Sequence, residues 1–315
     1  MDSSARLKSK FLGGMVGTAL GDAIGELAFA TTTEEALRSR IAQQQILVYT
    51  DDTAMALGLA QSLVARGEIA PQHLGDTFRR NYRQEPWRGY APGPPSLFRR
   101  VEQEGVTYTE AARQIYGGEG SFGNGASMRI APVGLFFHDA DDLYEQARRS
   151  ATVTHAHPLG VDGAALLGWT IAQVVDLDPE EDLPREKLAE GLMGFARTET
   201  FRTRLQEMVN LLISDVPPRE AGRRLGPGVA AHESVPFALY AFLRHYDSFE
   251  DCLFCAALNS GDRDTVGAMA CAISGAYLGV EALHRTWRAK LENRERIEAL
   301  ALDLWERTTE GSDGR

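Results

Sequence analysis

Apolar residues recur every three or four positions over most of the chain, which is the spacing of one face of an α-helix. After Asp52, apolar or small residues follow this spacing at Met55, Ala56, Leu59, Ala60 and Leu63. The same spacing is found in segments 143–151, 163–175, 236–244, 266–277 and 294–305. The strict alternation of apolar and polar residues that is typical of strands is scarce. We therefore predict an all-α fold in which many helices surround one core.

Two apolar segments are unusually rich in small residues. Segment 11–20 contains three glycines, and Asp22 ends the apolar run well short of the ~20 residues of a membrane span. Basic residues precede it, but no Ala-x-Ala cleavage site follows, so a buried helix is favoured over a signal peptide. Segment 266–277 is small or apolar on all sides, which predicts a helix that packs closely all round.

No stretch of the 315 residues separates two domains convincingly. The Pro/Gly-rich segments 88–95 and 226–228 are short enough to be ordered loops. Segment 176–185 is acidic, contains prolines and is expected to connect helices at the surface. The prediction is a single compact domain over residues 1–315, with a polar tail, 308–315, that is expected to be frayed.

Composition and charge exclude several classes of partner. With 43% hydrophobic and 24% charged residues, the chain is of the globular class. The formal net charge is −11, which argues against nucleic acid or an anionic membrane as partner but suits the binding of divalent cations. Three Cys residues make an odd number, so free thiols and a cytoplasmic location are expected. The sequence does not fix the oligomeric state; a monomer is slightly favoured.

Two short segments combine Asp and Thr directly before an apolar helix. The first is Tyr49-Thr-Asp-Asp-Thr53 and the second is Ser260-Gly-Asp-Arg-Asp-Thr265. Either could be no more than a helix N-cap, where carboxylates are favourable, and Arg263 could neutralise the second. Carboxylate and hydroxyl oxygens are also ligands of hard cations. The repetition of the pattern favours a site for two cations over two unrelated caps.

Three other motifs are weaker on their own. The segment Gly117-Gly-Glu-Gly-Ser-Phe-Gly-Asn-Gly125 has enough glycine to let backbone N–H groups approach a phosphate, but a flexible surface loop is an equal alternative. Thr154-His-Ala-His-Pro158 invites a zinc interpretation, yet no matching cluster exists, so one His contacting a ligand is favoured. Cys252 and Cys255 are spaced like core thiols of a helix.

Taken together and in order, these motifs resemble the ADP-ribosylglycohydrolase family. The resemblance covers most of residues 11–280 and rests on segments 11–25, 49–56, 120–129, 154–156, 233–238 and 261–265. Within the family, Tyr49-Thr-Asp-Asp-Thr-Ala-Met-Ala56, Arg88-Gly-Tyr90 and Glu233-Ser-Val-Pro236 look most similar to the branch that acts on ADP-ribosylserine.

The resemblance implies an all-α fold with two divalent cations, Mg²⁺ or Mn²⁺, in a central cleft. It implies that the cation ligands are Thr50, Asp51, Asp52, Asp262, Asp264 and Thr265. It also implies a diphosphate cradle and adenosine contacts formed by Gly93, Tyr116, Gly120, Ser121, Phe122, Gly123, Asn124 and His155. Asp264 would help to position or deprotonate the attacking water.

The chain departs from the family pattern at two positions. Many relatives carry a glutamate on the loop after the first helix, and counting without a gap places Phe29 there. Glu26 is the substitute we predict as the catalytic acid or base, with Glu34 and Glu35 as further candidates. The second departure is Arg263 between the two aspartates, which could tune cation affinity or point away to a phosphate or another carboxylate.

These observations predict a metal-dependent hydrolase that releases ADP-ribose from a modified protein or small conjugate. An O-linked substrate, ADP-ribosylserine or O-acetyl-ADP-ribose, is favoured over an N-linked arginine conjugate. The alternative of another class is a module that binds ADP-ribose without turning it over, since Phe29 cannot transfer a proton. A metal-free scaffold of the same fold is disfavoured, because six oxygen ligands would have no evident use there.

Overall fold

The computed structural model describes residues 3–312, with side chains through Thr309, and confirms the all-α prediction. The first half of these residues forms α1 Ser3–Ala28, α2 Glu34–Gln43, α3 Asp51–Arg66, α4 Pro71–Gln84, α5 Gly93–Glu104, α6 Tyr108–Gln114, η1 Tyr116–Gly118, η2 Asn124–Ala126, α7 Ala131–Phe136 and α8 Leu143–Ala151. The second half forms α9 Pro158–Val175, α10 Arg185–Phe195, α11 Glu199–Ile213, α12 Pro218–Leu225, α13 Ala231–Arg244, α14 Phe249–Asn259, α15 Arg263–Leu278, η3 Val280–Ala282, α16 Arg285–Lys290 and α17 Arg294–Ser312. Strand-like pairing within 3–312 is limited to two isolated bridges, Leu47 with Leu291 and Gly123 with Ala230.

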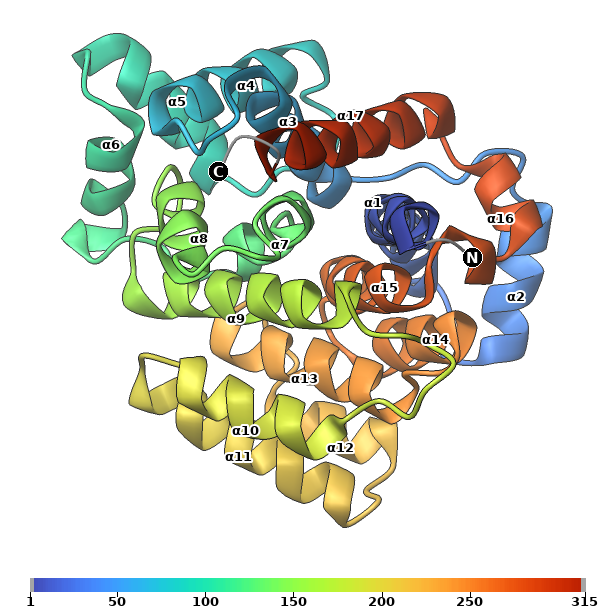
Figure 1. Ribbon diagram of the computed structural model, residues 1–315. Helices are drawn as coiled ribbons and strands as arrows, with labels where there is room; N and C mark the ends of the chain where they lie inside the picture. The colour runs from blue at the N-terminus through green and yellow to red at the C-terminus, as the bar shows by residue number, and fades with distance from the viewer. Residues whose placement is uncertain (1–2, 313–315) are drawn as a thin grey trace.

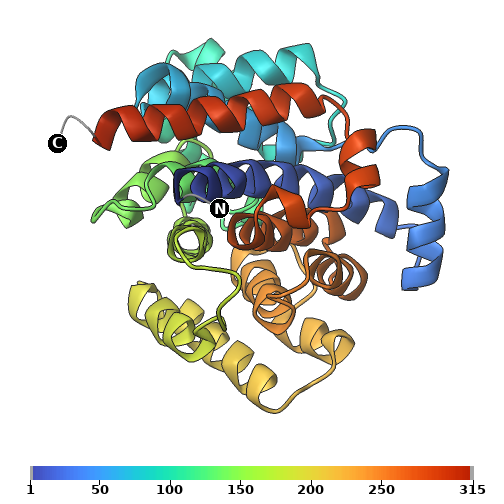
Figure 2. The ribbon, with the colours of Figure 1, turned by 45° about the vertical axis from the view of Figure 1, so that its right-hand side comes forward.

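Helices α1 and α15 form the centre of the molecule, and the others surround them (Figure 1). Helix α17 lies above α1, so the first and last helices of the described chain pack together (Figure 2). Helices α10, α11 and α12 form the opposite end of the molecule, below α9 and α13 (Figure 1). The core of buried apolar residues is one continuous cluster that draws on helices from both ends of the chain.

Several helices extend beyond the predicted limits. Helix α13 begins at Ala231, five residues before Pro236, which the helix accommodates inside its span. Helix α5 begins at Gly93, so the expected loop 88–95 ends three residues earlier than its prolines suggested. Helix α17 continues through the polar residues 308–312, where the sequence suggested a frayed tail; residues 313–315 lie outside the described part.

Two predictions about buried elements are confirmed. Cys252, Cys255 and Cys271 are free thiols buried in the core. The glycine-broken N-terminal segment is the buried part of α1.

Helix α9 is long and apolar enough to cross a bilayer, but 78% of its span is buried inside the protein, as in a core helix of a globular fold.

Candidate active site

The site depends on the close approach of α1 and α15. Glycines on α1 face the backbone of α15 at every fourth position, so the two main chains come into contact. A Cβ atom on Gly21 would lie 2.2 Å from the Gly267 carbonyl oxygen, and one on Gly25 would lie 2.4 Å from that of Arg263. Because Gly25 contacts the first turn of α15, the last turns of α1 lie beside the Asp-x-Asp segment.

Asp22 of α1 organises the first acidic turn. It is fully buried, and its carboxylate accepts hydrogen bonds from the backbone N–H groups of Thr50 and Thr53, each at 3.0 Å, and from the Thr53 hydroxyl at 2.6 Å. The Thr50 hydroxyl lies 2.8 Å from Asp22 Oδ1 and 3.0 Å from Asp52 Oδ2. Asp22 therefore fixes the start of α3 and with it the positions of Asp51 and Asp52.

The second acidic turn is joined to the glycine-rich segment. The side-chain amide of Asn124 donates to Asp262 Oδ2 at 2.6 Å, and the Thr265 N–H donates to Asp264 Oδ1 at 2.8 Å. The Arg263 side chain points away from this turn and donates to the carbonyl oxygens of Ala28 and Thr31, at 2.5 Å for Thr31. It therefore holds the loop that follows α1. The sequence suggested that Arg263 could point away to a phosphate or another carboxylate, but its partners here are backbone carbonyls.

Negative charge accumulates where the two turns meet. Burial, followed by the charges of Asp22 and Asp264, raises the pKa of Asp51 to about 7 and that of Asp52 well above its usual range. Burial and the charge of Asp264 also raise the pKa of Asp262 to about 6. Such a cluster of carboxylates is stabilised by a cation.

One buried oxygen supports the suitability of these residues for a cation. Asp52 Oδ1 is buried, and no hydrogen-bond donor among the described residues contacts it. A buried, unpaired carboxylate oxygen is costly unless it binds an ion. Within the described side chains, no three Asp, Glu, His or Cys residues are arranged to hold one ion by themselves. Hydroxyl oxygens of Thr50 and Thr265 would have to complete the set, so the two-cation site stays a prediction.

The glycine-rich segment packs on a buried arginine. Arg129 is fully buried and donates to the Gly125 carbonyl at 3.1 Å and to the Thr154 hydroxyl at 2.7 Å. Thr154 in turn lies 2.7 Å from Nδ1 of His155, whose pKa burial and the Arg129 charge lower to about 3. His155 is therefore a neutral ring beside the glycine-rich segment. A Cβ on Gly125 would lie 2.8 Å from this ring.

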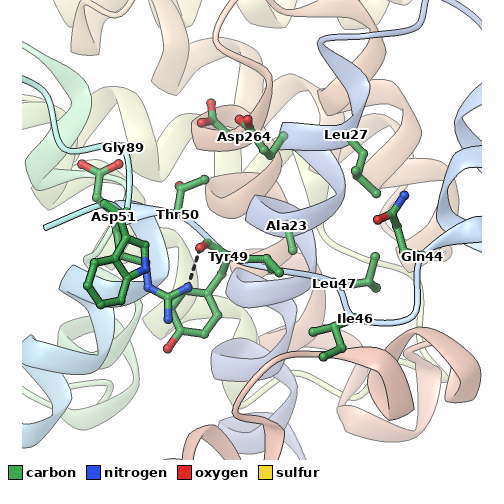
Figure 3. Close-up of a pocket in the computed structure, with 14 residues that line it drawn as sticks. Ala23, Leu27, Gln44, Ile46, Leu47, Tyr49, Thr50, Asp51, Gly89 and Asp264 are labelled. Carbon is green, nitrogen blue, oxygen red and sulfur yellow. Dashed lines mark hydrogen bonds between the residues drawn. The ribbon is translucent and has the colours of Figure 1, made fainter. Parts of the chain in front are cut away.

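Two cavities meet at the acidic turns. The first has a volume of about 390 Å³, and the second, beside the glycine-rich segment, about 270 Å³. Asp51, Gly89 and Asp264 line both cavities. Figure 3 shows Asp51 and Asp264 at one side of the first cavity, with Ile46, Leu47 and Gln44 at the other. A ligand bound across the carboxylates can therefore extend into both.

The structure brings most of the predicted residues together. The second cavity is lined by Gly93, Tyr116, Ser121, Gly123, Asn124, His155, Asp52, Asp262 and Thr265, and the first by Glu26 and Thr50. Gly120 and Phe122 do not line either cavity. The Phe122 ring instead packs against His157 and His232, at centroid distances of 5.5 and 6.2 Å. As the structure stands, Phe122 is thus not placed to stack on a ligand in the second cavity.

Glu26 shares the first cavity with Asp264, and burial followed by the Asp264 charge raises its pKa. The Phe29 side chain is 51% exposed.

Sequence reasoning missed two positioning residues. Asp22 was present in the Gly-Asp pair of the N-terminal motif, whereas Arg129 had no signal beyond its place at the end of the glycine-rich segment.

Comparison with known proteins shows which family shares this sequence and fold. A family profile described as ADP-ribosylglycohydrolase matches residues 3–313. The chain belongs to the ADP-ribosylglycohydrolase family. It is 33% identical to ADP-ribosylhydrolase ARH3 from Bos taurus, over 96% of this chain and 93% of the relative, and 32% identical to the Homo sapiens protein of that name, over 96% and 94%. A solved structure titled ADP-ribosylglycohydrolase-related protein complex superposes with a TM-score of 0.75 at 28% identity, covering 96% of this chain and 99% of that one.

These relatives confirm the resemblance found in the sequence and establish the chain as a glycohydrolase of the ADP-ribosylglycohydrolase family.

Proposed function

We propose that this ADP-ribosylglycohydrolase hydrolyses the glycosidic bond of O-linked ADP-ribosyl conjugates, ADP-ribosylserine foremost, with the help of divalent cations. The observation that carries the proposal is the meeting of two acidic turns between two cavities, one of which is lined by the glycine-rich segment. The substrate would place its diphosphate against Ser121, Gly123 and Asn124 and its reacting ribose carbon at the carboxylates. The leaving group would then extend into the first cavity.

Thr50, Asp51, Asp52, Asp262, Asp264 and Thr265 would hold Mg²⁺ or Mn²⁺, which when bound orients the ribose hydroxyls and the attacking water. Oxygen donors of this kind suit both ions. The unpaired Asp52 Oδ1 and the raised pKa values of Asp51 and Asp262 support this role, because a cation would relieve the repulsion among the carboxylates.

Glu26 and Asp264 divide the proton transfers of hydrolysis. Water adds to the anomeric carbon as the bond to the serine oxygen breaks, so water loses a proton and the serine oxygen gains one. Asp264 would accept the proton from water. A serine alkoxide leaves poorly without protonation, and Glu26 would supply the proton, because it lines the first cavity together with Asp264, and burial and the Asp264 charge raise its pKa. The sequence similarity of segment 49–56 to the serine-type branch also favours an O-linked substrate.

The test is release of ADP-ribose from ADP-ribosylserine and ADP-ribosylarginine peptides, each with Mg²⁺, with Mn²⁺ and with EDTA. We expect release from the serine peptide that EDTA abolishes. Asp264→Asn should lower the rate at least 100-fold, whereas Asp303→Asn, an exposed carboxylate on α17, should not change it. Release from the arginine peptide alone would contradict the O-linked assignment, and release that persists in EDTA would contradict the metal dependence.

A second candidate function is supported by Phe29. An exposed phenyl ring occupies the position where the family motif, counted without a gap, has a glutamate, and it cannot transfer a proton. If Glu26 does not replace that glutamate, the chain would bind ADP-ribose without turning it over. Calorimetric binding of ADP-ribose in Mg²⁺, combined with no release from any conjugate, would establish this function in place of hydrolysis.

A further inference from the structure

The first cavity has a rim of exposed apolar side chains. Trp87, Ile46 and Val48 all line it, and their exposed fractions are 70%, 56% and 53%. Large apolar side chains are normally scattered singly over a protein surface, and a contiguous group beside a reaction centre is typical of a binding surface. The cavity volume of about 390 Å³ lies within the range of small-ligand sites.

The local structure explains why these three side chains face solvent. Exposed and buried side chains alternate along residues 46–49, as they do where successive side chains point in opposite directions. Leu47 and Tyr49 are buried, and Leu47 is held by a bridge to Leu291, with its N–H 2.8 Å from the Lys290 carbonyl. Ile46 and Val48 must therefore point outward.

Trp87 is held outward by its neighbour. Arg88 is only 4% exposed, and its guanidinium donates to the Tyr49 carbonyl at 3.0 Å and to Glu292 at 2.5 Å. Gly89, at φ +86°, then turns the chain toward the carboxylates. The backbone at the exposed tryptophan is thus fixed by the buried Arg88 that follows it, which preorganises the tryptophan to bind a partner.

We propose that this rim, formed by Ile46, Val48 and Trp87, binds the polypeptide part of the substrate through an apolar side chain next to the modified serine. The inference rests on the proposed function. It follows from the continuity of the cavities: with ADP-ribose along the glycine-rich segment, the group attached to the anomeric carbon crosses Asp51 and Asp264 into the first cavity. A leaving group as small as acetate would leave the rim uncovered, whereas a peptide would cover it.

The experiment compares three substrates: an ADP-ribosylserine peptide with Leu on both sides of the modified residue, the same peptide with Ser at those positions, and N-acetyl-ADP-ribosylserine amide. We expect Trp87→Ala to lower kcat/KM for the Leu peptide about 10-fold, equivalent to about 1.4 kcal/mol. On the amide, the change should be less than twofold. Val48→Ser should act in the same direction and guards against a folding defect of the tryptophan variant.

The matched control is Ile213→Ser. Ile213 is 79% exposed at the end of α11 and does not line the first cavity, so this variant should hydrolyse all three substrates as the wild type does. Equal effects of Trp87→Ala on the Leu peptide, the Ser peptide and the amide, or no effect on any of them, would overturn the inference alone. No release of ADP-ribose by the wild type from any of the three would contradict the proposed function, and the inference with it.

Discussion

Substitution of Gly25 by Ala should damage stability and activity together. The new Cβ would lie 2.4 Å from the Arg263 carbonyl oxygen and 2.5 Å from Asp264 Cα, whereas ordinary contacts begin near 3.4 Å. Both contacted atoms belong to backbone, so α1 and α15 would have to separate by about 1 Å. Overpacking of this kind costs about 3 kcal/mol at the upper end of its usual range, and the gain in helix propensity of about 1 kcal/mol offsets part of it.

We therefore expect Gly25→Ala to lower the free energy of unfolding by about 2 kcal/mol and the Tm by roughly 4 °C. Activity should fall more than 10-fold at temperatures where the variant is folded, because Asp264 moves with α15. Thermal unfolding and ADP-ribose release measure the two effects. The control is Gly194→Ala in α10. Its new Cβ would meet no atom within 4 Å, so this substitution should stabilise the protein slightly. Wild-type Tm and activity in Gly25→Ala would refute the close packing of the two helices as the basis of the site.

Three further predictions concern the carboxylates and the histidine of the site. Glu26→Gln should lower ADP-ribose release at least 100-fold while leaving ADP-ribose affinity unchanged. Glu34→Gln should change neither the release nor the affinity, and equal rates for the two variants would exclude Glu26 as the proton donor. Mg²⁺ should raise the Tm of the wild type, and Asp52→Asn, which alters the unpaired buried oxygen, should abolish that rise, whereas the exposed Asp141→Asn should keep it. His155 has its pKa lowered to about 3 in the folded chain, so its neutral ring should cost stability as pH falls below about 6.5. Between pH 6.5 and pH 5 this loss amounts to about 2 kcal/mol; urea unfolding should show a flatter dependence in His155→Gln, and an unchanged slope would contradict the neutral ring.

The sequence alone was enough to predict the fold class, because helical periodicity survives in nearly every element. The limits of helices were harder to predict where local signals oppose the tertiary structure. Helix α13 continues through Pro236 because its other residues are buried on several sides, and that burial outweighs the lost hydrogen bond. Polar residues 308–312 extend α17 although nothing in their spacing requires it.

The residues of the candidate site that belong to sequence motifs could be predicted. Asp51 and Asp264 could be named because each precedes an apolar helix with a Thr beside it. The direction of a side chain was not predictable: Arg263 turns to the loop after α1, and Phe122 packs against two histidines. Asp22 and Arg129 were missed as site residues because a single buried charge leaves no periodic signal. Their roles depend on partners that are distant in sequence, as Thr50 is from Asp22.

The contacts between segment 47–50 and residues 290–293 determine when the site can form. Leu47 pairs with Leu291, the Tyr49 hydroxyl accepts a hydrogen bond from Asn293 at 2.9 Å, and Arg88 joins Glu292. During synthesis from the N-terminus, the first acidic turn can therefore pair early with Asp22 of α1, but it receives the supports from residues 290–293 only when nearly the whole chain has left the ribosome. A nascent chain that ends before residue 290 would keep the Asp22 contacts but lack these C-terminal supports. Contacts of such long sequence separation also form late in folding. Hydrolytic activity should therefore appear only after helices α16 and α17 have formed.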